Sequence, residues 1–188
     1  MVRAMLIAVL ITIGLQGNAQ TESRITRYNY FFLEAIRQQE MGNLAAAFDL
    51  LNHARDINPK APEVYYEIAG YYVAMQNSKA ARYNFEQAAK LAPDNSTYLE
   101  KLGQFYISQN NYEDALTTYE QLYTSNKTRE DVLQILYQLY GAQNNYKKMI
   151  EMIERMELLS GASEQLSLTK MQIYEQMGDK RKAQAELL

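Results

Sequence analysis

Apolar residues recur at helical spacing along most of the chain. In residues 62–75 they stand at positions i, i+3, i+4 and i+7, namely Tyr65, Ile68, Ala69 and Tyr72. Residues 78–91 carry a second stripe of this kind, made by Ala81, Phe85, Ala88 and Ala89. Such spacing predicts two amphipathic helices, each with one face turned toward a core. The strict alternation typical of a half-buried strand is not seen, so the sequence predicts an all-α fold.

The pattern repeats with a period of 34 residues. The clearest column of equivalent positions is a predicted turn, held by Asn43, Asn77, Asn111, Asn145 and Asp179. The residues before them are Gly42, Gln76, Asn110, Asn144 and Gly178. Such residues tolerate a left-handed backbone or cap the helix that follows. We therefore expect each repeat to be two helices joined by a tight turn.

Small and large residues occupy separate columns of the repeat. One small column holds Ala35, Ala69 and Gly103, and another holds Ala47, Ala81 and Ala115. A large column holds Leu51, Phe85, Tyr119 and Ile153. Small residues let two helix axes approach closely, while large ones fill the space between successive repeats. Repeat four carries Tyr137, Met149 and Met156 where small residues are expected, so its helices are expected to lie further apart or shifted.

Period, size columns and turns together resemble the tetratricopeptide repeat (TPR) family. The third repeat carries the resemblance best, with Leu102-Gly103, Tyr106, Asn111-Tyr112, Ala115 and Tyr119. The resemblance implies a right-handed superhelical solenoid of antiparallel helix pairs, all-α, with about five units, the last incomplete. The units would span residues 28–61, 62–95, 96–129, 130–163 and 164–188 of a solenoid over residues 28–188. TPR proteins bind other proteins or peptides, usually in a concave groove lined by the first helix of each unit.

The N-terminus has the features of an export signal. Residues 5–15 form an apolar run, preceded by Arg3 and followed by the small residues Gly17 and Ala19. A membrane-spanning helix needs about 20 apolar residues, so this run is short for one. We expect residues 1–19 to be a signal peptide and residues 20–27 an N-terminal extension. The chain would then be exported, to a bacterial periplasm in our interpretation; the alternative is an uncleaved segment that anchors it to the membrane.

Composition removes many chemical functions. The chain has 188 residues and no cysteine, which excludes disulfides, thiolate metal sites and cysteine nucleophiles. His53 is its one histidine, which excludes a multi-histidine metal site. The formal net charge of −3 leaves no general basic field for nucleic acid. Met149, Met152 and Met156 recur at helical spacing and are interpreted as core residues. We expect no enzyme, no catalytic residue, no metal and no cofactor.

The groove residues follow from the spacing of the first helices. The stripe beside the packing columns holds Phe32, Ile36, Tyr66, Val73, Glu100, Gln104, Ile107, Gln134 and Gln138, with Gln39, Gly70 and Gly141 on the same line. Its early part is apolar and its later part is rich in amides, which would suit an extended peptide or a helix. The competing interpretation is that residues 20–30 fold back over Phe32 and Ile36. Acidic residues nearby, among them Glu63 and Glu67, argue against a clamp for a partner's carboxylates.

The predicted function is a protein-interaction scaffold that binds another protein or a peptide. Leu188 ends the sequence within a helix, which leaves an open hydrophobic end. We expect either a longer natural chain or docking of that end on another chain, self-association included. The alternative function is the extracytoplasmic sensor portion of a longer signal-transducing protein. An apolar stretch of about 20 residues downstream in the parent reading frame would favour the sensor.

Overall fold

The computed structural model describes the backbone of residues 2–186 and the side chains of residues 21–186. Over these residues the chain is helical throughout, without strands. The helices are α1 (Val2–Glu40), α2 (Leu44–Ile57), α3 (Pro62–Ala74), α4 (Ser78–Leu91), α5 (Ser96–Ser108), α6 (Tyr112–Ser125), α7 (Glu130–Ala142), α8 (Tyr146–Ser160), α9 (Glu164–Gln176) and α10 (Lys180–Ala185). The helices predicted over residues 62–75 and 78–91 are confirmed as α3 and α4.

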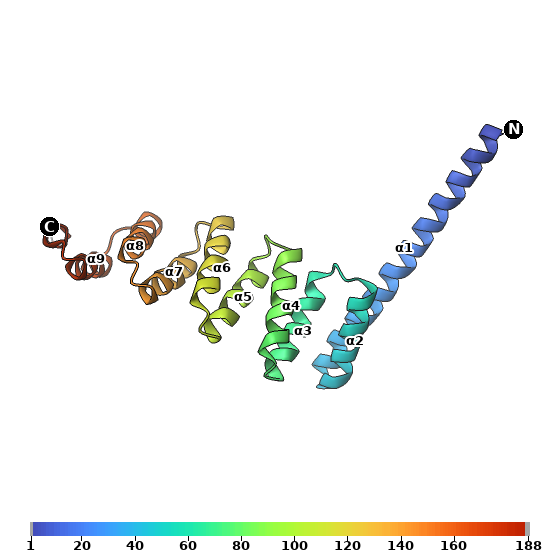
Figure 1. The fold of residues 1–188 in the computed structure, drawn as a ribbon, viewed down its shortest axis with the longest axis horizontal. Helices are drawn as coiled ribbons and strands as arrows, with labels where there is room; N and C mark the ends of the chain where they lie inside the picture. The colour runs from blue at the N-terminus through green and yellow to red at the C-terminus, as the bar shows by residue number, and fades with distance from the viewer. Residues whose placement is uncertain (1, 187–188) are drawn as a thin grey trace. The chain divides into compact units, whose positions relative to one another are not determined.

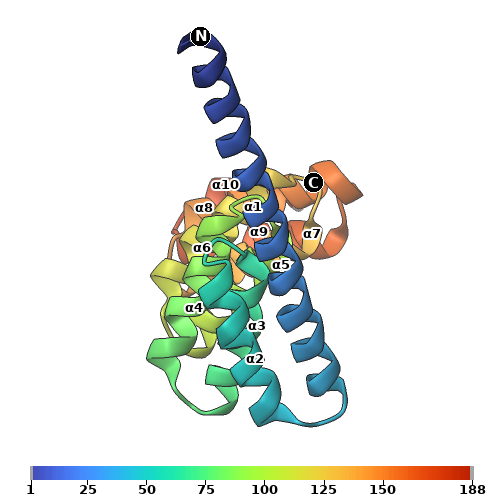
Figure 2. The ribbon, with the colours of Figure 1, turned by 90° about the vertical axis from the view of Figure 1, so that its right-hand side faces the viewer.

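The helices divide into two compact bodies. Residues 1–92 form the N-terminal body, in which α1 packs on α2, α2 on α3, and α3 on α4 (Figures 1 and 2). Residues 93–188 form the C-terminal body, in which each helix from α5 to α10 packs on the next. Within each body, consecutive helices pair and the pairs stack in chain order. The prediction of an all-α solenoid built from helix pairs is confirmed.

The five predicted turns have one geometry in the described chain. The first residue of each takes a positive φ of 81° at Gly42, 57° at Gln76, 56° at Asn110, 55° at Asn144 and 77° at Gly178. The second residue is the N-cap of the next helix. In repeat two, the Gln76 amide donates to the Val73 carbonyl and the Asn77 amide to that of Tyr72, both at 2.9 Å. This pair of bonds is the Schellman arrangement that ends a helix at a left-handed residue.

The caps explain why asparagine and aspartate recur in the second turn position. The side chain of Asn77 accepts a hydrogen bond from the Ala80 amide at 3.1 Å. Asn111, Asn145 and Asp179 accept in the same way from the third residue after them. Each cap satisfies an amide that the first turn of a helix leaves without a partner. The Asn43 side chain is the exception, because it donates to Gln38 Oε1 at 2.7 Å instead.

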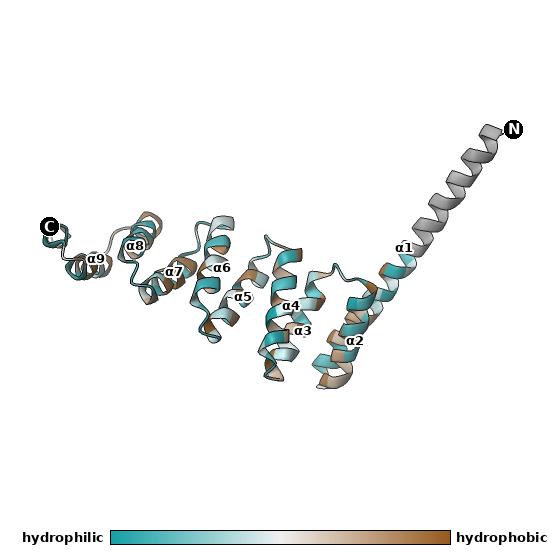
Figure 3. Ribbon diagram, in the orientation of Figure 1, coloured by the Kyte–Doolittle hydropathy of each residue, from teal (hydrophilic) through white to brown (hydrophobic). Residues whose placement is uncertain are grey.

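The core of the N-terminal body lies where α1, α2 and α3 meet. Its buried residues are Tyr28, Ala35, Leu51, Ala54, Ala61, Val64 and Ile68. Aromatic side chains of the same three helices, including Phe31, Phe32, Phe48 and Tyr72, pack around this cluster. Figure 3 shows hydrophilic and hydrophobic residues alternating around individual helices. Each helix therefore contributes one apolar stripe to the core, as the sequence pattern predicts.

A close approach of two helices marks the core of the C-terminal body. Gly103 of α5 faces the ring of Tyr119 on α6, and a Cβ added at Gly103 would lie 2.6 Å from Tyr119 Cε2. The steric role predicted for the small column is thus visible at this pair. In repeat four Tyr137 stands at the position equivalent to Gly103, and the nearby glycine is Gly141, where an added Cβ would lie 3.4 Å from Met149 Cε. Met149, Met152 and Met156 are all buried, which confirms that they fill the core.

A half-buried group of ions joins the last three helices. Lys170 of α9 lies 2.9 Å from a carboxylate oxygen of Glu157 on α8 and 2.8 Å from one of Glu186, which follows α10. Burial opposes the charge on Lys170, but hydrogen bonds to the two carboxylates outweigh it and raise the pKa of the ammonium. The group therefore ties α10 to the helices before it.

The first helix extends past the first predicted repeat. Residues 20–30 continue α1 in the structure, so they do not fold back over Phe32 and Ile36. The side chains of the predicted signal peptide, residues 1–19, lie outside the described residues, and its cleavage stays a prediction. Within the part of the chain that the structure describes, no helix is both long and apolar enough to cross a bilayer.

Candidate partner-binding surface

The residues predicted on α1 and α3 lie in different environments. The ring of Phe32 stacks on that of Tyr28 with centroids 5.9 Å apart, and it packs against the core. Tyr66 is half-buried, and its ring meets that of Phe85 edge-on at 6.3 Å. Val73 is 49% exposed, and Ile36 is half-buried. Of these four, Val73 is the side chain most available to a partner.

A pocket of about 220 Å³ lies between α1 and α3 in the N-terminal body. We call it the α3 pocket; its lining residues are Gln39, Leu44, Glu67, Gly70, Tyr71 and Ala74. Gly70 opens it, because apart from the adjacent residues and backbone of α3 no atom lies within 4 Å of the place where a Cβ would be. The Tyr71 hydroxyl donates to Gln39 Oε1 at 3.1 Å and so links α3 to α1 beside the pocket.

The α3 pocket contains one half-buried carboxylate. Burial raises the pKa of Glu67, and a hydrogen bond with the Gln39 side chain partly opposes that rise. Burial also raises the pKa of Tyr71, and the negative charge of Glu67 adds to the effect. The pocket thus combines an apolar lining with one carboxylate that is poorly solvated.

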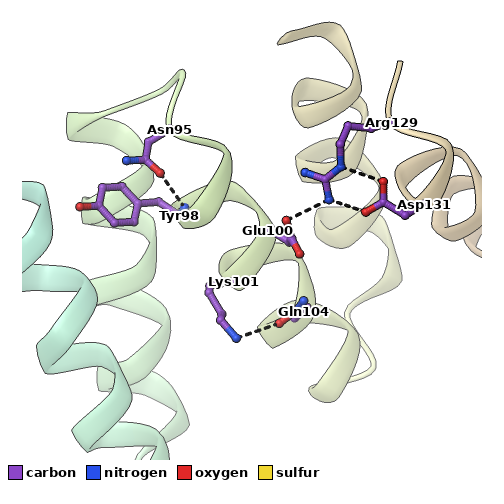
Figure 4. A network of polar contacts seen from close by, with 7 residues as sticks. All are labelled: Asn95, Tyr98, Glu100, Lys101, Gln104, Arg129 and Asp131. Atoms are coloured by element: carbon purple, nitrogen blue, oxygen red, sulfur yellow. Dashed lines mark hydrogen bonds and ion pairs between the residues drawn. The ribbon is translucent and has the colours of Figure 1, made fainter. Parts of the chain in front are cut away.

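In the C-terminal body the predicted residue Glu100 is engaged by an arginine (Figure 4). Arg129, the N-cap residue of α7, places Nη2 3.1 Å from Glu100 Oε2 and Nε 2.7 Å from Asp131 Oδ1. Hydrogen bonding by Arg129 holds the pKa of Asp131 below its usual range, although burial partly opposes this. The contact ties α5 to α7, so Glu100 is a structural partner within the chain.

The remaining predicted residues of the C-terminal body are polar and accessible for the most part. Gln104 is exposed and accepts a hydrogen bond from Lys101 Nζ at 3.3 Å (Figure 4). Gln134 and Gln138 are exposed on α7, and Ile107 is half-buried on α5. The side-chain amides of Gln134 and Gln138 are thus exposed on α7.

A second pocket of about 230 Å³ lies where α7, α8 and α9 meet. It is lined by Gln134, Tyr137, Ile153, Met156, Gln165, Leu166 and Thr169. Tyr137 stands here in a column that holds alanine or glycine in the earlier repeats. Of the predicted residues, Gln134 is the one that this pocket includes.

The other candidate groups show no chemistry of their own. His53 is exposed on α2, and its ring lies 5.5 Å from that of Phe31. Among the described residues, no group of three or more histidine or acidic side chains is placed to hold a metal ion. Both pockets described above are of side-chain size, and each is lined in part by helices that open the repeats.

Sequence reasoning placed Gly70 on the groove stripe but did not single out Glu67 and Tyr71 as pocket residues. The pocket-lining residues of α3 stand at i, i+3, i+4 and i+7 from Glu67. The predicted stripe passes through Tyr66, Gly70 and Val73. The face of α3 that lines the pocket is therefore rotated around the helix by about one residue position from the predicted stripe. The 34-residue period fixes which positions are equivalent, but the rotation of a helix against its neighbour depends on packing.

Helices that pair through one kind of turn and stack in sequence define a helical-hairpin repeat protein. Models of the tetratricopeptide repeat match residues 62–95 and residues 99–133. The chain is therefore a tetratricopeptide repeat protein. A comparison with curated proteins gave no match.

Solved structures share the fold. A tetratricopeptide repeat protein from Parabacteroides merdae is 18% identical, with a TM-score of 0.65 over 86% of this chain and 64% of that chain. MamA from Desulfovibrio magneticus is 16% identical, with a TM-score of 0.60 over 86% and 91%. YrrB, a TPR protein, is 15% identical, with a TM-score of 0.62 over 84% and 81%. At these identities the likeness concerns the fold alone.

Proposed function

We propose that the chain is a non-catalytic interaction scaffold that binds a peptide or a helix of another protein along the first helices of its repeats. The observation that carries the proposal is the α3 pocket, an open hollow between two first helices. Leu44 in its lining and Val73 beside it are each about half exposed, so apolar side chains already face solvent there. Such a surface supplies apolar anchor points for a partner.

Two further observations support a peptide as the partner. The pocket volume suits a single side chain and is small for a cofactor. YrrB, which shares the fold, is described as having an unusual peptide-binding site. Exposed amides at Gln104, Gln134 and Gln138 would add hydrogen bonds to a bound backbone.

The experiment is a selection of peptides from a random display library on the full chain, followed by measurement of their affinity. Gly70→Leu should fill the α3 pocket, and Val73→Glu should charge its rim. Both variants should weaken the selected peptides at least tenfold while the melting temperature stays within a few degrees. Tyr83→Ala is the matched control, because Tyr83 is an exposed aromatic residue on α4. Peptides that bind equally well to all three variants would refute the proposed surface.

Phe32 and Tyr66 are poor choices for this test. Phe32 packs on the core, and Tyr66 contacts the ring of Phe85. Alanine at either position should lower stability and binding together, which would not distinguish a groove residue from a core residue.

We also propose that the scaffold acts after export and that residues 1–19 are removed. The apolar run followed by Gly17 and Ala19 supports this. N-terminal sequencing of the protein from its native envelope should start at Gln20. An intact Met1 in that material would refute cleavage.

Self-association stays a second expectation for the C-terminal end. A hollow of about 470 Å³ beside α10, lined by Met171, Glu175, Lys180, Ala183 and Gln184, supports it. Sedimentation of the full chain across a range of concentrations tests it, and a single monomeric species at all of them would refute it.

A further inference from the structure

We propose that the α3 pocket recognises a lysine side chain of the bound peptide, with the aliphatic stem against its apolar lining and the ammonium at Glu67. This inference rests on the proposed function, because it names the side chain that the peptide presents there. Three features of the pocket support it, namely its carboxylate, its lining and the way neighbouring carboxylates are paired.

The first step is the state of the Glu67 carboxylate. It is half-buried in the wall of the pocket, and its side-chain hydrogen bond is with the amide of Gln39. Glu67 takes part in none of the ion pairs found among the described residues. A carboxylate removed from water without a cation is destabilised, and a bound cation would relieve that cost.

The second step is the shape and chemistry of the lining. Leu44, Ala74 and the ring of Tyr71 make most of the wall apolar, and Gly70 leaves room beside them. A lysine side chain has an apolar stem and a compact charged end, so it matches a pocket that is apolar with a single carboxylate. An acidic side chain would meet Glu67 as a like charge, and a purely aliphatic one would leave the Glu67 carboxylate without a cation.

The third step concerns how the other acidic groups of the same body are used. Glu34 is paired with Arg37, whose Nε donates a hydrogen bond of 2.8 Å to Glu34 Oε2. Glu63 accepts a hydrogen bond from the Tyr28 hydroxyl. Their charges are satisfied within the chain, whereas the charge of Glu67 opens into a hollow. Glu67 therefore differs from Glu34 and Glu63 in facing a pocket that a partner's cation could enter.

The test uses three acetylated and amidated pentapeptides, Leu-Ala-X-Ala-Leu, in which X is lysine, norleucine or glutamate. Norleucine keeps the stem and removes the charge. Binding to the full chain is followed by the methyl NMR signals of Leu44 and Ala74, which line the pocket. The lysine peptide should bind about tenfold more tightly than the norleucine peptide, and the glutamate peptide should bind least.

Two variants assign the preference to the pocket. Glu67→Gln should remove the tenfold preference for lysine and leave the affinity for the norleucine peptide unchanged. Glu40→Gln is the matched control, because Glu40 is an exposed carboxylate at the end of α1 and its loss changes the net charge equally. Glu40→Gln should keep the preference.

Four results would overturn the inference. The first is equal affinity for the lysine and norleucine peptides, and the second is a preference for lysine that survives Glu67→Gln. The third is peptide binding that does not shift the methyl signals of Leu44 and Ala74. The fourth is that n-butylamine binds as tightly as the lysine peptide. The last would indicate a site for free amines. Library peptides that bind through Gly70 and Val73 without selecting lysine would refute this inference and leave the proposed function standing.

Discussion

Replacing Gly103 with alanine should destabilise the C-terminal body, although alanine is the better helix former. The added Cβ would lie 2.6 Å from Cε2, 3.0 Å from Cδ2 and 3.1 Å from Cζ of Tyr119. Carbon atoms in contact normally lie about 3.5–4.0 Å apart, so the ring has to move by close to 1 Å. Tyr119 is 1% exposed, so its ring has to move against other buried side chains.

The size of the effect follows from two opposing contributions. Overpacking a well-filled core costs about 1–3 kcal/mol. Exchanging glycine for alanine inside a helix raises the free energy of unfolding by about 1 kcal/mol. The expected loss in the free energy of unfolding is therefore up to about 2 kcal/mol, measured by urea denaturation of the full chain.

Gly141→Ala is the matched control in the same body. There the added Cβ would meet the flexible end of Met149, at 3.4 Å from Cε and 3.7 Å from Sδ. The helix propensity should dominate, and stability should rise by about 0.5–1 kcal/mol. A Gly103→Ala variant as stable as Gly141→Ala would show that the Tyr119 ring does not restrict α5, and the reasoning would be wrong.

A double substitution tests the same contact from the other side. Combining Gly103→Ala with Tyr119→Leu reproduces the pair Ala35 and Leu51 of the first repeat. The two changes should cost less together than the sum of their separate costs, by about 1 kcal/mol or more. Additive costs would indicate that the two positions do not compete for one space.

Four further predictions concern the turns and the ion pairs. Gln76→Gly should stabilise the chain by about 0.5–1 kcal/mol in urea denaturation, because glycine adopts a φ of 57° without strain; a loss of stability would contradict this. Asn77→Ala should cost about 1 kcal/mol in the same assay, since the cap on the Ala80 amide is lost. Arg129→Gln should let the pKa of Asp131 rise toward 3.8, followed by carboxyl NMR. Because the pKa of Asp131 is lowered in the folded chain, the ionised carboxylate stabilises the fold above about pH 3.8, and this contribution is lost as the pH falls. The variant lacks this contribution, so it should lose less stability than the parent protein on acidification. Lys170→Met should leave two carboxylates facing each other and speed amide exchange in α10, and unchanged exchange would contradict the role of this ion group.

The sequence was sufficient to predict the helices and the turns because both depend on local interactions. Asn77 and its equivalents were expected either to tolerate a left-handed backbone or to cap a helix, and the structure assigns capping to them. The left-handed role belongs to the residue before, including Gln76, whose side chain gives little indication of it. The backbone hydrogen bonds to Val73 and Tyr72 hold that residue in place.

The candidate surface was harder to predict because it depends on contacts between repeats. Glu100 lies on the predicted groove stripe, yet Arg129, 29 positions along the chain, engages it. Phe32 also lies on the stripe, but its ring packs on Tyr28 and the core. The repeat period cannot reveal which side chains of neighbouring repeats meet. Glu67 was recognised only as an acidic position, and its half-burial follows from how α3 rests against α1.

The fit of Tyr119 over Gly103 bears on how such repeats can be recombined. Along the two columns the partners change together, from Ala35 with Leu51, through Ala69 with Phe85 and Gly103 with Tyr119, to Tyr137 with Ile153. Where the first helix of a hairpin has a larger side chain in its column, the second helix has a smaller one in its own. A chimeric hairpin with α5 as its first helix and α8 as its second would combine two helices whose side-chain sizes do not match. Whole hairpins, rather than single helices, are therefore the smallest pieces that could be exchanged or inserted without repacking.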